Sequence, residues 1–375
     1  MKGESRKLEA AVGVELKSAH RGRPENPMTP LARRPALRRS VVLLLAILLP
    51  ACAGSPTPGT AVAPLERGSS PPSSLGPEAL GASLEASPGG FSAGEGPADL
   101  EARLQDRIHR EGDTIHISLA LLDLEDGTRI EIDAHRRYHA ASTMKVPVLL
   151  ELYRQTEAAG GSVEENVLVT NTFRSIYDGT PFILESDRDE ALLTALGGEL
   201  PARRIAEGMI QVSSNLGTNI LLEHLTPDSV QATMHRIGAE GMEVLRGVSD
   251  IPAFEAGLSN RTTAYGYLRT LEVIASCELT DREACREMME ILEGQQFTRE
   301  IPAGIPPEAR ARGTRVGNKT GSITGILHDG AIVRPHHRDP YLLVILTEGY
   351  QDRAVGSATM AELSGMVWNH LTRTP

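Results

Sequence analysis

The segment 53–98 most limits what this chain can fold into. It is rich in Pro, Gly, Ser and Ala and has few large apolar side chains. Such a segment cannot bury enough surface to offset the entropy lost on ordering. We therefore expect a leader and signal peptide over 1–52, a flexible tether over 53–98, and a single folded domain over 99–375. With 40% hydrophobic and 23% charged residues, the chain has the composition of an ordinary globular protein.

The N-terminal region is typical of an exported protein. Arginines at 33, 34, 38 and 39 precede the apolar run 41–49, and small residues follow. The run is shorter than the roughly 20 residues that a helix needs to span a bilayer. Leu49-Pro50-Ala51-Cys52 resembles the bacterial lipobox, which makes Cys52 the candidate lipidation site; a plain secretory signal is the alternative. We expect a protein of the periplasm or cell envelope whose only membrane attachment is this lipid.

Charge and cysteine content exclude several classes of protein. A formal charge of −11 and a pI near 5.5 argue against a nucleic-acid binder. Three cysteines cannot form a disulfide framework, and the histidines are scattered without the spacing of a metal site. We therefore expect no metal and no cofactor. Cys277 and Cys285 flank the join of two predicted helices, where either a disulfide or two free thiols would fit.

The periodicity of apolar residues predicts a mixed fold. Strands are expected over 115–123, 128–132, 315–319, 330–334 and 341–346, with a turn at His328 and Asp329. Helices are expected over 142–157, 201–225, 262–276, 281–294 and 353–371. Strands at both ends around a helical middle predict an α+β fold (an α/β sandwich) in which one antiparallel sheet, built from both ends of the domain and flanked by helices, adjoins a helical lobe.

The distribution of lysine singles out two positions. The chain has 38 Lys and Arg residues, but beyond residue 17 the only lysines are Lys145 and Lys319. Arginine therefore serves wherever a surface cation is needed. Because arginine cannot lose its proton in a protein, whereas a buried lysine can, a lysine kept at two positions indicates proton-transfer chemistry.

Lys145 lies in the sequence Ser142-Thr-Met-Lys, and Lys319 lies in Lys-Thr-Gly. Residues three apart share one face of a helix, so Lys145 can reach the Ser142 hydroxyl. A serine needs an adjacent base to become a nucleophile, and a lysine can act as that base if burial or a second cation lowers its pKa. Ser213-Ser-Asn215 completes a set of three motifs.

This set resembles the motifs of the serine β-lactamase and penicillin-binding protein superfamily, and specifically of class A-like β-lactamases. The resemblance covers about residues 105–375 and is carried mainly by 137–155 (RYHAASTMKVPVLLELYRQ), 213–222 (SSNLGTNILL) and 317–325 (GNKTGSITG). It implies the β-lactamase/DD-peptidase-like fold and an acyl-enzyme formed on a serine.

The resemblance also implies roles for individual residues. Ser142 is the expected nucleophile, Lys145 its proton acceptor or relay, and Ser213 the donor to the leaving nitrogen. Substrate would be bound by the remaining motif residues and by the oxyanion-hole amides of Ser142 and Ser322; these binding residues are Asn215, Lys319, Thr320, Gly321 and Ser322.

A class A enzyme also needs a carboxylate that activates the deacylating water. Glu255, ahead of Leu258 and Asn260, resembles the family's E-x-x-L-N pattern with one residue inserted. Glu255 is the candidate base and Asn260 its partner, while Asp250 is a rival carboxylate and a structural role is the alternative. Tyr177, in a predicted turn of the helical lobe, is a candidate substrate contact.

We therefore expect a monomeric serine hydrolase that opens β-lactam rings through an acyl-enzyme on Ser142. One alternative is a penicillin-binding protein, a D-Ala-D-Ala carboxypeptidase or another serine hydrolase with slow deacylation. Another is a non-catalytic envelope lipoprotein that has kept the fold. The expected ligand is a β-lactam or a D-Ala-D-Ala-like peptide.

Overall fold

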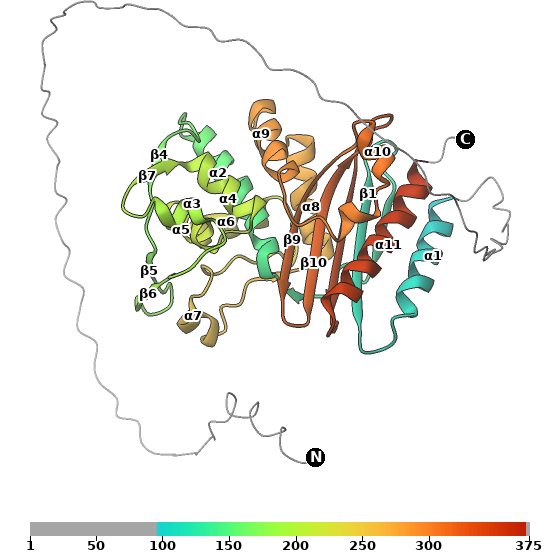
Figure 1. The fold of residues 1–375 in the computed structure, drawn as a ribbon, viewed down its shortest axis with the longest axis horizontal. Coiled ribbons are helices and arrows are strands. Elements are labelled where there is room, and N and C mark those ends of the chain that lie inside the picture. Colours follow the sequence, from blue (N-terminus) through green and yellow to red (C-terminus); the bar gives the residue numbers. More distant parts are fainter. Residues whose placement is uncertain (1–95, 373–375) are drawn as a thin grey trace, which may run out of the picture. The chain divides into compact units, whose positions relative to one another are not determined.

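The computed structural model describes residues 96–372 (Figure 1). The predicted signal peptide, Cys52 and nearly all of the predicted tether lie outside the described residues. The described part starts with α1 (Pro97–His109). Within it, no helix is both long enough and apolar enough to cross a membrane.

One antiparallel sheet forms the centre of the fold. Its strand order is β2-β1-β11-β10-β9, so strands from the start of the domain pair with strands from its end. The strands are β1 (His116–Asp123), β2 (Arg129–Ile132), β9 (Arg315–Ile323), β10 (Ile326–Arg334) and β11 (Tyr341–Glu348). The predicted sheet built from both ends of the domain is therefore confirmed.

Helices cover both faces of this sheet, with α1 and α11 (Arg353–Leu371) on one face and α8 (Ala264–Ser276) on the other (Figure 1). The alternation of side chains along β1 accounts for this arrangement. Ile117, Leu119 and Leu121 enter the core that also holds buried residues of α1 and α11, whereas Ala120 and Leu122 enter the core shared with α8. Because both faces are covered, β1 is apolar almost throughout.

The helical lobe lies on the α8 side of the sheet and shares its core (Figure 1). Its main helices are α2 (Lys145–Ala158), α4 (Ala202–Gln211), α5 (Asn215–Leu225), α6 (Pro227–Arg236) and α9 (Arg282–Glu293). The remaining elements are short. They are η1 (Ala141–Met144), α3 (Glu190–Thr194), α7 (Ile251–Glu255), η2 (Ile301–Gly304), α10 (Pro307–Ala311), and the strand pairs β3 (Tyr138–His139) with β8 (Arg261–Thr262), β4 (Asn166–Leu168) with β7 (Glu199–Pro201), and β5 (Thr172–Arg174) with β6 (Pro181–Ile183).

Two predicted elements were wrong in detail. The single helix expected over 201–225 is broken between α4 and α5, because Ser213 adopts a left-handed backbone conformation with φ of 60°. Ser214 then starts α5 by accepting a hydrogen bond from the backbone N–H of Gly217. His328 and Asp329 lie fully buried within β10 rather than in a turn, because that strand begins at Ile326.

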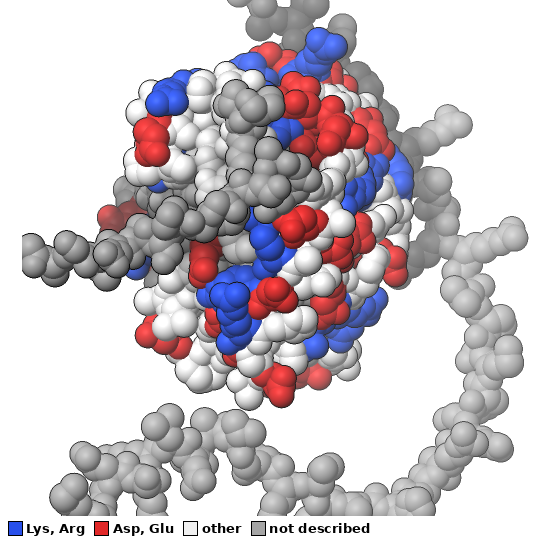
Figure 2. Space-filling model, turned by 90° about the vertical axis from the view of Figure 1, so that its right-hand side faces the viewer, with Lys and Arg blue, Asp and Glu red and all other residues white. Residues whose placement is uncertain are grey.

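Charges of both signs are interspersed on the face of the molecule that carries α1 and α11 (Figure 2). Several of them are paired: Arg107 of α1 contacts Glu111 and, across to α11, Glu362.

The structure pairs Cys277, at the end of α8, with Cys285 of α9 as a disulfide. The two Cα atoms are 5.7 Å apart.

Candidate active site

Ser142 lies in η1, the short 3-10 turn that leads from β3 into α2. The preceding residue, Ala141, has a φ of 48°, a conformation that costs a non-glycine residue free energy and that is found preferentially at functional sites. The strand β9 runs close alongside. A Cβ on Gly321 would lie 3.1 Å from the backbone nitrogen of Ser142 and 2.9 Å from Cγ2 of Thr143. Only glycine permits this approach, which brings the Lys-Thr-Gly motif to the Ser142 backbone.

Lys145, the first residue of α2, is completely buried. Its Nζ donates to the Oδ1 of Asn215 at 2.8 Å and to the carbonyl oxygens of Ser213 and Ser214 at 2.9 and 3.1 Å, and it lies 3.3 Å from the Ser213 hydroxyl. Burial, followed by the nearby charge of Lys319, lowers the pKa of Lys145 well below its usual value. The neutral amine that a general base requires is therefore favoured here.

Lys319 approaches the same hydroxyl from β9. Its Nζ donates to Ser213 Oγ at 3.1 Å and to the backbone oxygen of Thr320 at 2.8 Å. Burial lowers the pKa of Lys319 to about 7, although the buried carboxyl of Asp329 opposes this shift. The two lysines that the sequence singled out therefore meet at Ser213.

The break between α4 and α5 places Ser213 between the two amines. The N-terminus of α5 is fixed by Asp187, whose Oδ2 accepts from the backbone N–H groups of Asn215 and Leu216 at 2.7 and 2.8 Å. A carboxylate at a helix N-terminus is favoured by the free N–H groups and the helix dipole. Asp187 thereby orients Asn215, whose side chain holds Lys145.

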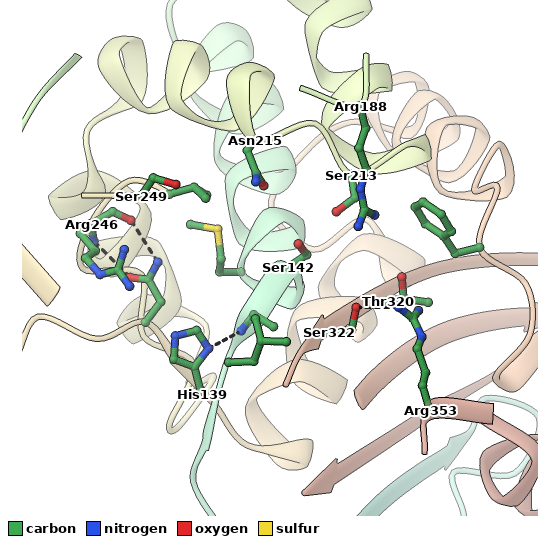
Figure 3. Close-up of a pocket in the computed structure, with 16 residues that line it drawn as sticks. His139, Ser142, Arg188, Ser213, Asn215, Arg246, Ser249, Thr320, Ser322 and Arg353 are labelled. Carbon is green, nitrogen blue, oxygen red and sulfur yellow. Dashed lines mark hydrogen bonds between the residues drawn. The ribbon is translucent and has the colours of Figure 1, made fainter. Parts of the chain in front are cut away.

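A pocket opens in front of these groups (Figure 3). It is lined by polar motif residues and by residues from the 246–260 segment and the strand β9. The lining residues are His139, Ala141, Ser142, Met144, Arg188, Ser213, Asn215, Arg246, Val248, Ser249, Asn260, Phe297, Thr320, Ser322, Ile323 and Arg353. Three are arginines and none is aspartate or glutamate, so this pocket is suited to an anionic ligand.

One end of the pocket is built for a carboxylate. Thr320 and Ser322 of β9 line it, and the Ser322 hydroxyl accepts a hydrogen bond from Arg353 Nη1 at 3.1 Å. Arg353 is half-exposed and lies 3.7 Å from the buried carboxylate of Glu300. Arg188, across the same end, rests on the ring of Phe297 at 5.2 Å.

The structure does not bring Glu255 into this pocket. Glu255 ends α7, is exposed, and makes no side-chain hydrogen bond or ion pair within the described residues. Asp250 is buried, and each of its carboxylate oxygens accepts a backbone N–H, one from Ala253 and one from Ile176. Asn260 does line the pocket, but its amide is occupied by the backbone of Leu245 and Arg246. Tyr177 is 63% exposed and does not line the pocket.

Sequence reasoning missed several pocket residues, among them Arg188, Arg246, Phe297 and Arg353. No sequence signal distinguishes these three arginines from the many that form surface ion pairs. His139 was also missed, although it lies only three residues before Ser142. No group of three His, Cys, Asp or Glu side chains in the range 96–372 is placed to hold a metal ion.

Comparison with known proteins gives the family. Residues 99–371 match the model of the "Beta-lactamase enzyme family". The chain belongs to the beta-lactamase enzyme family. This membership confirms the resemblance and the fold expected from the motifs, and it makes the chain a hydrolase of the serine β-lactamase type.

Individual members of the family are distant in sequence. A beta-lactamase of Proteus vulgaris is 21% identical over 263 residues, covering 69% of this chain and 91% of that protein. Beta-lactamase CTX-M-6 of Salmonella typhimurium is 24% identical over 232 residues, covering 61% and 74%. Among solved structures, a beta-lactamase from Sphaerobacter thermophilus has a TM-score of 0.63 at 21% identity, covering 73% of this chain and 98% of its own. PBP-A has the same TM-score at 18% identity, covering 73% and 96%.

Proposed function

We propose that this protein hydrolyses β-lactams through an acyl-enzyme on Ser142. The observation that carries the proposal is the meeting of Lys145 and Lys319 at the Ser213 hydroxyl, in the pocket that Ser142 lines. Two desolvated amines around one hydroxyl make a proton-transfer site, and the adjacent serine supplies the nucleophile.

In the proposed acylation step, Ser142 Oγ forms a bond to the lactam carbonyl carbon and passes its proton to the neutral amine of Lys145. The ring C–N bond then breaks, and the leaving nitrogen takes a proton from Ser213, which is replenished by Lys145 across their 3.3 Å contact. In this step the backbone N–H groups of Ser142 and Ser322 would hold the oxyanion; the close passage of β9 at Gly321, next to the Ser142 backbone, supports this role. Removing one such donor typically costs about 3 kcal/mol of transition-state stabilisation.

Substrate recognition follows from the cationic end of the pocket. Lys319 supplies the charge, and the hydroxyls of Thr320 and Ser322 supply hydrogen bonds for the substrate carboxylate. Asn215 is placed to hold the substrate amide while it steadies Lys145. A penicillin and a D-Ala-D-Ala peptide both carry an acyl bond beside a carboxylate, so both fit this description. A single-residue variant of the related PBP-A has been solved as an acyl-enzyme complex with penicillin G.

One observation favours a second candidate function, a penicillin-binding protein or D-Ala-D-Ala carboxypeptidase with slow deacylation. No Asp or Glu is among the residues that line the pocket. For Glu255 to activate the deacylating water, the 250–259 segment would have to turn its carboxylate inward. The lifetime of the acyl-enzyme therefore separates the two functions.

Other parts of the proposal concern the cellular setting. We propose export by the signal within residues 1–52, lipidation at Cys52, a tether over 53–98, and a location in the periplasm or cell envelope. The protein would act as a monomer, without a cofactor, and without binding nucleic acid.

The test measures the rate of penicillin G ring opening by spectrophotometry, for the purified wild-type protein and for Ser142→Ala assayed in parallel. The proposal expects hydrolysis by the wild-type protein and a loss of at least about 100-fold in the variant, as for removal of a nucleophile. Hydrolysis that persists in Ser142→Ala would overturn it. Stoichiometric acylation without turnover would favour the second candidate.

A further inference from the structure

The pocket extends to both sides of Ser142. Figure 3 shows Ser213, Thr320, Ser322 and Arg353 on one side, and Arg246, Ser249 and His139 on the other. In the proposed function, on which this inference rests, the first side receives the carboxylate of the leaving amine. The second side must then receive the acyl portion of the substrate, because the scissile carbonyl lies at Ser142.

Arg246 is unusual among the arginines of this chain. It is only 8% exposed, yet no carboxylate within the described residues forms an ion pair with it. The one hydrogen bond that its side chain makes there runs from Nη1 to the Gly247 oxygen at 2.9 Å, and its Nε is buried without a partner. The guanidinium packs on the ring of Phe254 at 5.1 Å. A buried charge normally has an ion-pair partner, so the structure leaves this one open to a ligand.

The carboxylate of Asp250 acts on Arg246 only from a distance. Burial lowers the pKa of the Arg246 guanidinium, and the charge of Asp250 partly opposes that shift. Asp250 itself is held by the backbone N–H groups of Ala253 and Ile176, so it is not free to turn toward Arg246.

The neighbouring pocket groups are also donors. The His139 Nδ1 accepts from the backbone N–H of Ala141 at 3.0 Å, so a neutral ring carries its proton on Nε2. Burial, followed by the charge of Arg246, lowers the pKa of His139 and favours that neutral form. Ser249, held at a φ of 62°, adds a hydroxyl. This side therefore offers a cation and neutral donors, with no carboxylate among the residues that line it.

We propose that Arg246 binds a carboxylate carried by the acyl portion of the substrate, on the side of Ser142 opposite the Lys319 anchor. The preferred substrate is thus an anion at both ends. It is either a β-lactam whose acyl side chain ends in an acidic group or a peptide with an acidic group on the acyl side of the scissile bond. Arg246 is a specificity-determining residue and takes no part in proton transfer.

The test uses 6-aminopenicillanic acid acylated with dicarboxylic acids of increasing length, each compared with its terminal methyl ester. The second-order rate constant for acylation of the full-length protein is measured by intact mass, so deacylation does not enter. We expect the acid to react at least about tenfold faster than its ester at one or more lengths, as for one charge-assisted hydrogen bond. The acid-to-ester ratio is the rate constant of the acid divided by that of its ester. In Arg246→Gln this ratio should approach one, and in Arg246→Lys it should fall at least about threefold below the wild-type value.

Arg261→Gln is the matched control. Arg261 belongs to the same stretch of chain, pairs with Glu243 at 3.7 Å and does not line the pocket, so its variant should keep the wild-type ratio. An acid-to-ester ratio near one at every length in the wild type overturns the inference, as does a ratio unchanged in Arg246→Gln. If Arg246→Gln does not react with the esters, Arg246→Lys decides: a reduced ratio supports the inference and an unchanged ratio overturns it. If no penicillin acylates the wild-type protein, the proposed function itself fails.

Discussion

Lys145 and Lys319 both contact the hydroxyl oxygen of Ser213, at 3.3 and 3.1 Å. They reach it from α2 and β9, which are separated by most of the domain sequence. Two buried amines so close together repel when both are charged, so one of them tends to lose its proton. This arrangement favours one proton acceptor beside one cation.

The first prediction concerns pH. Lys319 must be charged to bind a carboxylate, and burial lowers its pKa to about 7. As pH rises through that value, the free protein loses the charge, so the second-order rate constant for acylation by penicillin G should fall above about pH 7. Stopped-flow measurements between about pH 5 and about pH 9 check this. The methyl ester of the penicillin carboxylate is the control, because it should lack this basic limb; an identical limb for acid and ester would contradict the assignment.

The second prediction concerns Lys145→Arg. Arginine stays protonated and therefore cannot act as a proton acceptor, because its pKa is above about 12. We expect acylation to slow by about 100- to 10,000-fold, the range typical of a lost general base. The rate of adduct formation by mass spectrometry measures it. Acylation within about tenfold of the wild-type rate, in a variant shown to be folded by circular dichroism, would rule out Lys145 as the base.

The third prediction concerns Gly321→Ala. The added Cβ would meet Cγ2 of Thr143 and the backbone nitrogen of Ser142, so β9 must move away from η1. We expect a loss of about 1–3 kcal/mol in the free energy of unfolding and a marked loss of acylation. Denaturant unfolding and adduct formation provide the two readouts. Gly365→Ala, on α11, is the control: its Cβ would meet Gly304 at an ordinary 3.4 Å, and stability and acylation should remain near wild type. Equal behaviour of the two variants would refute the close approach.

The fourth prediction concerns the deacylating base. Because Glu255 is exposed and does not line the pocket, we expect Glu255→Gln to leave the lifetime of the acyl-enzyme within about twofold of wild type. The lifetime is measured by following loss of the penicillin adduct after removal of free ligand. A lifetime prolonged more than about tenfold would instead restore Glu255 as the base.

The sheet and the lysine pair could be predicted from the sequence because their signals lie in short stretches of the chain and do not depend on tertiary contacts. Long apolar runs fix β1 and β11, and the rarity of lysine marks Lys145 and Lys319 without any knowledge of the fold. The break at Ser213 was missed because the residue with the left-handed φ is a serine and not a glycine, so the sequence carries no signal of it.

The remainder of the site depends on how loops pack. The acidic pattern around Glu255 resembles a catalytic loop in sequence, but the segment folds into α7 with its carboxylate outward. The arginines at 188, 246 and 353 come from three unrelated segments, and only the folded chain brings them to one pocket.

The most direct test is an intact-mass time course after mixing the protein with penicillin G, followed by peptide mapping of the adduct. We predict a mass increase of one penicillin, located on Ser142, that decays with release of the opened ring and is absent in Ser142→Ala. No adduct on the wild-type protein, or an adduct that persists in Ser142→Ala, would contradict the central claim.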